Sequence, residues 1–300
     1  MTKRTHWMAH AAVLSANLIY GANYSIAKLV MPEYIKPFGF ITLRVLFTGL
    51  LFLLYGFLMG NDQVEYKDRW RLFWCAVFGV AINQLLFFKG LDLTTPIHAA
   101  LMMTTNPIMV LLSAWFILKN RITWIRLTGI SLGITGACWL IFQNKQPLSG
   151  GPSVLGDVFI LINALSFAIF LIMVKPLMSK YSTATVMKWV FMFGSVLVLP
   201  FGWTEFLQIP WHLFDARLWG LVAFVVIGTT TLAYVFNTYA LKKLSAPEVS
   251  VYIYLQPVFA VMFAVLLGKD QLQWSHLVSA MLIFAGVYLA SDKMSAPSTK

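Results

Sequence analysis

The sequence predicts an all-α membrane protein of ten transmembrane helices, arranged as two inverted five-helix repeats. Three observations predict it: the composition, a succession of apolar stretches of spanning length, and an internal repeat. Of the 300 residues, 59% are hydrophobic and only 11% are charged, whereas a soluble domain carries about 25% charged residues. The mean hydropathy is +0.77. The chain has too few charges to cover a water-facing surface, so most of its surface must face lipid.

Ten apolar stretches approach the length of about 20 residues that a helix needs to cross the bilayer core. They cover residues 8–29, 39–58, 71–90, 97–118, 124–142, 155–174, 184–202, 218–241, 246–267 and 274–290. Every connection between them is short, so we expect no soluble domain. The first stretch is longer than the apolar core of a signal peptide, and we expect it to be an uncleaved helix.

Lysine and arginine gather on alternate connections. They are concentrated near the N-terminus, in residues 67–71, 119–126, 175–180 and 242–243, and near the C-terminus. Positive charge is retained on the cytoplasmic side of a membrane, so this pattern predicts a multi-pass protein of the bacterial inner membrane with both termini cytoplasmic. The same pattern accounts for the net charge of +11 without a nucleic-acid partner, because no basic stripe lies on an exposed face.

An internal repeat relates the two halves of the chain. Residues 91–136 match residues 241–286 in register, including Pro107 with Pro257, Trp124 with Trp274 and Gly136 with Gly286. We interpret this as a duplication into repeats covering residues 8–142 and 155–290. Because each repeat holds an odd number of helices, the second must be inverted relative to the first. Inverted repeats are typical of secondary transporters, which hold a substrate between the halves near the middle of the bilayer.

Short motifs follow the helices in a fixed order. The first helix carries the segment from Asn17 to Lys28, and the second carries Arg44. The fourth carries Thr95-Pro96 and Asn106-Pro107, and the ninth carries Ala246-Pro247-Glu248 and Gln256-Pro257. This combination resembles the EamA family of the drug/metabolite transporter superfamily, with two EamA domains. The family usually has a glutamate after the fourth and ninth helices, where this chain has Asn120 and Asp270. The resemblance implies secondary transport, often export of amino acids or related metabolites.

Two basic side chains lie within predicted spans, where ionisable groups are costly and mark functional sites by default. Arg44 lies near one end of the second helix, and Lys188 occupies a related position in the seventh. Facing a wet cavity, either side chain would attract a carboxylate or phosphate group. The alternative is that both extend to the lipid headgroups.

The fourth and ninth helices each carry a semi-polar stripe with a spacing of four residues. The stripes are His98, Met102 and Asn106 in one helix, and Glu248, Tyr252 and Gln256 in the other. Residues four apart lie on one helix face, so the stripes would line a central substrate cavity. Asn106 and Gln256 also precede prolines, and each proline frees a backbone carbonyl. Glu248 is a candidate for proton coupling. The alternatives are that Asn106 and Gln256 only join helices through hydrogen bonds, and that Glu248 is an acid at the cytoplasmic edge of the membrane.

Other polar and aromatic side chains lie near mid-span and complete the predicted substrate site. They are Asn17, Tyr20, Tyr24, Asn83, Phe87, Tyr234 and Asn237. Aromatic walls with a few amides suit amphipathic zwitterions, although packing and interfacial belts account for many aromatic residues. Small residues in the fifth and tenth helices, including Gly133, Gly136 and Gly286, should instead allow close helix contact.

We therefore predict a secondary transporter that exports amino acids or related small metabolites by alternating access, as a monomer or homodimer. The export direction follows from the resemblance. A passive channel or facilitator is the first alternative. An enzyme is less favoured because the sequence has no HExxH motif, no GxSxG motif with partners and no Gly-rich phosphate loop. Cys75 and Cys138 lack the spacing of a metal or disulfide site, and no cofactor is expected.

Overall fold

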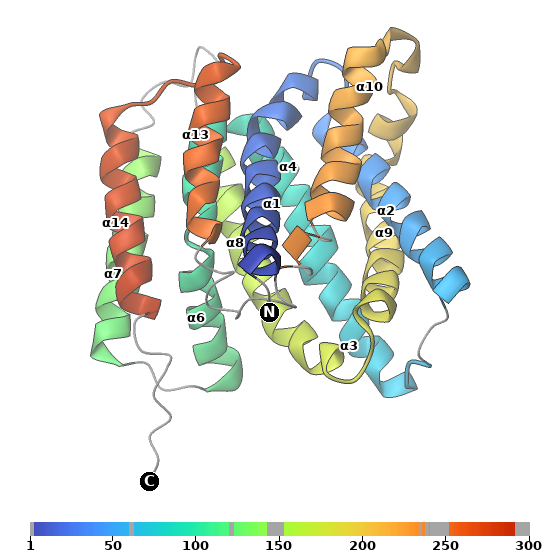
Figure 1. Cartoon of the computed structure of the whole chain (residues 1–300), viewed down its shortest axis with the longest axis horizontal. Helices are drawn as coiled ribbons and strands as arrows, with labels where there is room; N and C mark the ends of the chain where they lie inside the picture. Colours follow the sequence, from blue (N-terminus) through green and yellow to red (C-terminus); the bar gives the residue numbers. More distant parts are fainter. Residues whose placement is uncertain are drawn as a thin grey trace.

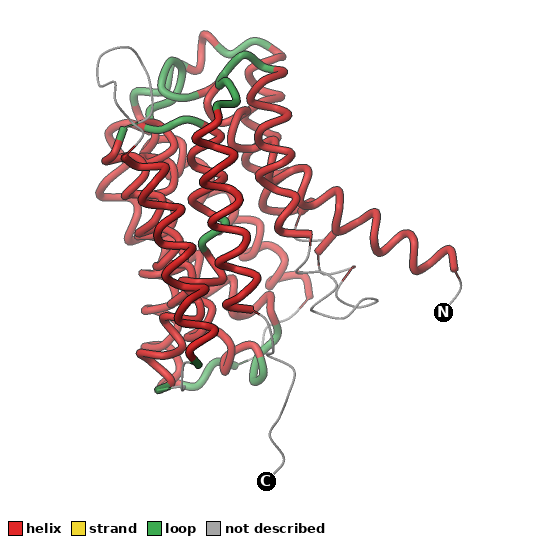
Figure 2. The backbone as a smooth tube through the Cα atoms, turned by 90° about the vertical axis from the view of Figure 1, so that its left-hand side faces the viewer, coloured by secondary structure: helices red, strands yellow, loops and turns green. Residues whose placement is uncertain are grey.

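The computed structural model describes residues 3–59, 63–119, 123–142, 153–233, 236–237, 240 and 252–291. These residues form helices joined by short turns, and none of them belongs to a β-strand. The helices stand side by side in one bundle (Figure 1). Figure 2, turned by 90°, shows that the N-terminal part of the first helix leans outward from this bundle.

The helices before residue 150 follow the predicted spans with several internal breaks. They are α1 (Lys3–Val30), α2 (Pro37–Met59), α3 (Tyr66–Ala76), the π-helical segment η1 (Val77–Ala81), α4 (Ile82–Leu93), α5 (Pro96–Met103), α6 (Asn106–Leu118) and α7 (Trp124–Phe142). In the second half lie α8 (Val154–Met178), α9 (Thr183–Leu207), the 3₁₀ turn η2 (Trp211–Leu213), α10 (Ala216–Ala223), the π-helical η3 (Phe224–Leu232), the 3₁₀ turn η4 (Tyr252–Leu255), α13 (Gln256–Leu266) and α14 (Trp274–Ser291).

Six helical stretches within the described ranges are long and apolar enough to cross a membrane. They are Pro37–Leu54, Tyr66–Leu93, Pro96–Ile117, Trp124–Phe142, Val154–Met178 and Ala184–Leu207. Three shorter apolar helices follow, at Ala216–Thr229, Gln256–Leu266 and Trp274–Leu289. The prediction of an all-helical membrane protein is thus confirmed, whereas the number ten stays a prediction. Helix α1 contains the predicted span 8–29 but begins five residues earlier, at Lys3, and polar residues such as His10, Asn17 and Asn23 lower its hydropathy.

The two ends of the described chain lie on the same side of the bundle. Helix α1 begins, and α14 ends, at the lower side in Figure 1, which we call the terminal side. The opposite side, where α5, α8 and α14 begin, is called the distal side. Large apolar side chains such as Trp124, Trp274 and Met281 are exposed around the bundle. A soluble monomer seldom exposes so much apolar surface, so this perimeter suits lipid.

Helices from the two halves of the chain pack against each other throughout the bundle. Helix α2 lies along α9, α7 along α14, α4 along α8, and α1 along α13. One continuous apolar core joins these contacts and includes the buried side chains Phe40, Phe88 and Ile160. The halves are therefore not separate lobes, and a side chain from one half regularly meets partners from the other.

The contact between α7 and α14 confirms the predicted role of the small residues (Figure 1, left). A Cβ atom added at Gly286 would lie 2.5 Å from the backbone nitrogen of Gly133. The hydroxyl of Ser279 donates a hydrogen bond to the carbonyl of Gly136 at 2.7 Å. The two backbones touch directly, which leaves no room between these helices for a substrate.

Replacing Gly286 with alanine should therefore force α7 and α14 apart. We expect Gly286→Ala to lower the free energy of unfolding by about 1–3 kcal/mol, the usual cost of overpacking. Denaturant titration of the purified protein in detergent, followed by circular dichroism, measures this change. The matched control is Gly220→Ala in α10, where an added Cβ meets nothing within 4 Å. Equal effects of the two substitutions would contradict the close contact.

Candidate functional site

The predicted fourth span is broken directly before the Asn106-Pro107 pair. Helix α5 ends at Met103 and α6 begins at Asn106. Pro107 has no backbone N–H, so the carbonyl of Met103, four residues earlier, lacks its usual helical partner. At the break, the carbonyl of Leu101 accepts from both the backbone N–H and the hydroxyl of Thr104, at 3.1 and 2.6 Å. The carbonyl of Met102 accepts in the same way from Thr105, at 3.1 and 2.7 Å. The sequence thus positions a stable break within the membrane.

A related irregularity precedes the second amide–proline pair. The 3₁₀ turn η4 ends at Leu255 and α13 begins at Gln256. The third and eighth spans also change geometry, through the π-helical segments η1 and η3. Such segments are rare and are frequently found at functional sites. Hydropathy gave no signal for them, because a π-helical turn has the same side chains as an α-helical one.

Two cross-bundle hydrogen bonds attach α1 to the segment that contains Gln256. The side-chain amide of Gln256 donates to Asn17 Oδ1 at 2.9 Å, and Asn17 in turn donates to the carbonyl of Val13 at 2.8 Å. One turn earlier, the Tyr252 hydroxyl lies 2.8 Å from Nδ1 of His10. The three predicted site residues Asn17, Tyr252 and Gln256 therefore meet at one helix junction.

Arg44 lies among aromatic and amide side chains from three elements. Its guanidinium carbon lies 5.7 Å from the centre of the Phe88 ring, a cation–π distance. Tyr20 of α1 lies beside Arg44 and the side chain of Asn237. Asn237 also donates to the carbonyl of Ala233 at 3.0 Å. The structure thus brings the predicted site residues Tyr20, Arg44 and Asn237 together.

An aromatic wall continues from this cation. The rings of Phe88 and Phe87 lie 5.4 Å apart, and the ring of Tyr24 lies 5.8 Å from that of Phe87. Tyr24 is one helical turn from Tyr20, so both side chains share a face of α1. We use the name Arg44 site for Tyr20, Tyr24, Arg44, Phe87, Phe88 and Asn237. Its chemistry suits an anionic group beside an apolar or aromatic body.

Several buried amide oxygens have no hydrogen-bond partner within the described part of the chain. They include Oδ1 of Asn106, Oδ1 of Asn23 and Oε1 of Gln84. Such acceptors are rare in folded proteins, because an unsatisfied buried polar group costs about 1–3 kcal/mol. They remain available to donors such as the ammonium group of a ligand. Sequence reasoning missed Asn23 and Gln84, although both are polar residues within spans.

Other predicted site residues lie elsewhere. Asn83 forms a reciprocal pair with Asn163: Asn163 Nδ2 donates to the Asn83 carbonyl at 2.6 Å, and Asn83 Nδ2 donates to the Asn163 carbonyl at 3.4 Å. This pair joins α4 to α8, which favours the helix-joining alternative. Met102 is completely buried in the core, and Lys188 is half-buried in the second turn of α9 on the terminal side. Tyr234 and Glu248 fall outside the described residues.

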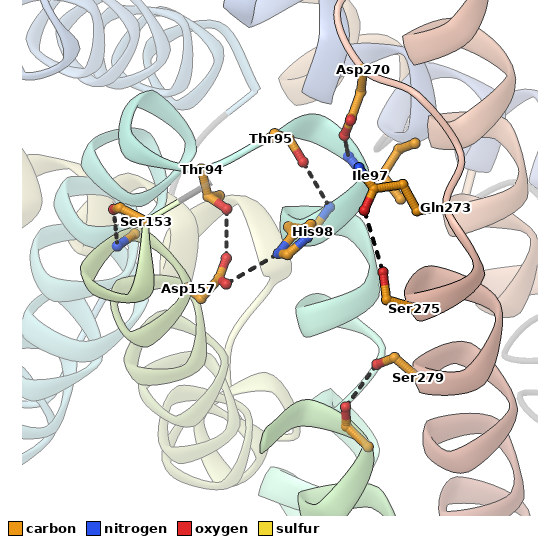
Figure 3. A network of polar contacts seen from close by, with 12 residues as sticks. Thr94, Thr95, Ile97, His98, Ser153, Asp157, Asp270, Gln273, Ser275 and Ser279 are labelled. Atoms are coloured by element: carbon orange, nitrogen blue, oxygen red, sulfur yellow. Dashed lines mark hydrogen bonds and ion pairs between the residues drawn. The ribbon is translucent and has the colours of Figure 1, made fainter. Parts of the chain in front are cut away.

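His98 belongs to a separate group near the distal ends of three helices (Figure 3). Its Nδ1 lies 3.1 Å from Oδ2 of Asp157, and Thr94 Oγ1 donates to Oδ1 of the same carboxylate at 2.5 Å. The ring of His276 stands at 90° to that of His98, with the centroids 5.0 Å apart. We call Thr94, His98, Asp157 and His276 the distal polar cluster. Sequence reasoning missed Asp157, although it is an acid at the start of an apolar stretch.

A bundle of interleaved membrane helices, with breaks and a basic side chain inside the spans, has the architecture of a membrane transporter. The chain belongs to the EamA-like transporter family, whose model matches residues 7–142 and again residues 154–292. The recognised family is thereby confirmed, with one copy of the family domain in each half of the chain.

Curated relatives match almost the whole chain. An uncharacterized transporter of Archaeoglobus fulgidus is 23% identical over 98% of this chain and 99% of its own length. The uncharacterized transporter YetK of Bacillus subtilis is 24% identical over 96% of this chain and 88% of its own length. The uncharacterized inner membrane transporter YicL of Salmonella typhimurium is 23% identical over 93% of each chain. One solved crystal structure, 18% identical, superposes with a TM-score of 0.60 over 94% of this chain and 96% of its own.

The reciprocal pair predicts that Asn163 stabilises the bundle. Asn163→Leu removes the side-chain hydrogen bond to the Asn83 carbonyl that joins α8 to α4, so the free energy of unfolding should fall by about 0.5–1.5 kcal/mol, the net contribution of one hydrogen bond. Denaturant titration in detergent measures the change. Thr128→Ala is the control, because Thr128 is exposed and bonds only to the carbonyl of Ile125 within its own helix. Unchanged stability of Asn163→Leu would show that the pair contributes nothing.

Proposed function

We propose that the protein is a secondary transporter that exports carboxylate-bearing metabolites, namely amino acids or related compounds, by alternating access. The observation that carries this proposal is the Arg44 site. A guanidinium held within a span, next to aromatic rings and an amide, provides what a small amphipathic anion or zwitterion needs. The transporter names of the relatives support the coarser function.

The packing of the helices supports an arrangement of two inverted five-helix repeats, residues 8–142 and 155–290. If each helix is replaced by its equivalent in the other half of the chain, the pairs α2–α9 and α7–α14 are unchanged. The contact of α4 with α8 then becomes the contact of α10 and η3 with α1. The contact of α13 with α1 becomes the contact of α5 and α6 with α8. Such a pattern is what a pseudo-two-fold axis in the membrane plane produces.

Within this arrangement, the substrate carboxylate would bind the Arg44 guanidinium, and its ammonium group would face the orphan amide oxygens of Asn23, Gln84 or Asn106. The apolar part of the substrate would lie against Tyr24 and Phe87. The breaks at α5–α6 and η4–α13 are positions where one part of a helix can shift relative to the other. Movement there would expose the site to one side of the membrane at a time.

The proposed setting is the inner membrane, with the terminal side in the cytoplasm. The sequence places most lysines and arginines on the terminal side of the bundle, as the positive-inside rule requires. In the described structure this side carries Lys67, Arg69 and Lys180. Export of amino acids is the direction that the family resemblance implies.

The role of Arg44 can be tested by counterflow in proteoliposomes loaded with an unlabelled mixture of the twenty amino acids. We expect saturable uptake of labelled amino acids by the wild type, and a loss of about tenfold or more in Arg44→Gln, because a charge-assisted contact contributes about 1.5–3 kcal/mol. Arg44→Lys should retain part of the flux, since it keeps the charge but loses the planar fork.

The control for this experiment is Lys67→Gln, which removes a basic side chain that is 75% exposed on the terminal side. Its flux should equal that of the wild type. Full activity of Arg44→Gln would remove Arg44 from the substrate site. Wild-type flux that never saturates, together with single-channel currents in a planar bilayer, would show that the protein is a channel and not a carrier.

A further inference from the structure

We propose that the distal polar cluster is a proton-binding site, and that its proton is the ion that drives transport; the coupling part rests on the function proposed above. The cluster lies apart from the Arg44 site. It joins the first turn of α8, the first turn of α5 and the first turn of α14, all on the distal side (Figure 3). The bonds of Asp157 to Thr94 and His98 join different helices, whereas His276 also accepts from the Gln273 N–H at the start of α14.

The acid of the cluster is completely enclosed. Asp157 has a relative exposure of 0%, and His98 and His276 have exposures of 4% and 3%. The carboxylate accepts from the Thr94 hydroxyl on one oxygen and lies 3.1 Å from His98 Nδ1 on the other. Both neighbours act as donors to an ionised carboxylate, so the network assigns the Nδ1 proton to His98.

The remaining nitrogen of His98 is the group that gains and loses the proton. With Nε2 protonated, the imidazolium and the Asp157 carboxylate have no net charge. With Nε2 deprotonated, the pair carries one negative charge out of contact with water. A change of charge in a buried group is costly to accommodate, so the two states differ in the free energy of enclosing the cluster. Histidine is suited to this exchange, because its ordinary proton affinity lies near neutral pH.

His276 limits the cluster to one added proton. The backbone N–H of Gln273 donates to His276 Nδ1 at 3.1 Å, so this nitrogen acts as an acceptor and the ring is neutral. The two rings are 5.0 Å apart, and two imidazolium ions at that distance would repel each other. A proton on one ring therefore disfavours a proton on the other.

Charged groups on several neighbouring elements bear on this exchange. On the loop after α13, Asp270 Oδ2 accepts from the Ile97 backbone N–H at 3.2 Å, and Lys269 precedes it. On α1, Lys28 donates to the Asp92 carbonyl at 2.8 Å, and on α4, Lys89 pairs with the Asp92 carboxylate at 2.9 Å. The distal half of α7, residues 133–142, carries no acidic or basic side chain. Asp270 adds negative charge on the side of His276, which favours a bound proton.

The position of the cluster explains how a proton could be coupled to transport. Helix α5 has eight residues, a length of about 12 Å at 1.5 Å per residue. His98 lies in its first turn, and its last residue, Met103, precedes the break before Asn106. Its neighbours α8 and α14 belong to the other half of the chain. A change of charge at His98 therefore acts on the interface between the two halves of the chain. This interface lies one short helix away from Asn106, whose side-chain oxygen belongs to the proposed substrate region.

Proton binding can be measured without transport. Unbuffered, detergent-solubilised protein is titrated between about pH 8 and about pH 5 with a pH indicator dye, and we expect the wild type to take up about one proton more than His98→Gln. Glutamine keeps a donor to Asp157 but does not titrate in this range. His212→Gln, at an exposed histidine of η2, removes one titrating group without touching the cluster and serves as the stoichiometric reference. Equal uptake by wild type and His98→Gln would overturn the proposed site.

Coupling is measured in proteoliposomes with labelled amino acids, with and without a pH gradient. We expect His98→Gln to keep counterflow within a few-fold of the wild type, while flux driven by the gradient falls about tenfold or more. Asp157→Asn should behave alike, because it removes the charge that holds the proton, and it carries the test if His98→Gln does not fold. Gradient-driven flux at the wild-type level in a folded variant would overturn coupling. Absence of counterflow in the wild type would instead contradict the transport function, while the titration still decides the proton site.

Discussion

The constraint on which this structure depends is the satisfaction of backbone hydrogen bonds where water is absent. Inside a bilayer an unpaired N–H or C=O group costs several kcal/mol, so irregular backbone survives only where protein groups replace the missing partners. At the end of α5, the Leu101 and Met102 carbonyls accept both from the backbone N–H groups three residues on and from the hydroxyls of Thr104 and Thr105. The break they permit places Asn106 at the start of a new helix with a buried, unpartnered oxygen. A regular helix would not place such an unpaired side-chain oxygen in the interior of the bundle.

The fold follows from the sequence where length and hydropathy decide it. The span predicted at 124–142 coincides with α7, Trp124–Phe142, because polar or turn-forming residues flank an uninterrupted apolar run. The span predicted at 71–90 instead extends from Tyr66 to Leu93 in three pieces. Its first turns are exposed and partly charged, so a hydropathy window excludes them although the backbone is helical. The π-helical pieces depend on hydrogen-bond geometry and on packing partners from the other half, neither of which a hydropathy pattern contains.

The site could be predicted only in part, for a related physical reason. The sequence reveals that a residue is polar and how deep it lies, and on this basis it predicts Tyr20, Arg44 and Asn237, which the structure brings together. It does not reveal which partner each side chain meets. Asn83 and Asn106 have the same chemistry and a similar depth, yet Asn83 is paired with Asn163 whereas Asn106 Oδ1 has no partner within the described chain. His98 likewise meets Asp157 only because α5 and α8 begin side by side on the distal side.

The depth of Arg44 in the membrane is set from outside its own helix. Helix α2 begins with backbone N–H groups that have no acceptor within the helix. On the distal side, Glu205 Oε2, at the end of α9, accepts from the N–H groups of Phe38 and Gly39 at 2.8 and 2.9 Å. A carboxylate at a helix start also gains from the helix dipole. On the terminal side, Lys180 pairs with Glu65 and Asp68, and its hydrogen bond lowers the pKa of Glu65. These groups join the start of α3 to the turn after α8 and do not hold α2. The cap by Glu205 attaches the start of α2 to the end of α9. Because Arg44 lies less than two turns from this cap, the attachment helps to fix the position of the guanidinium.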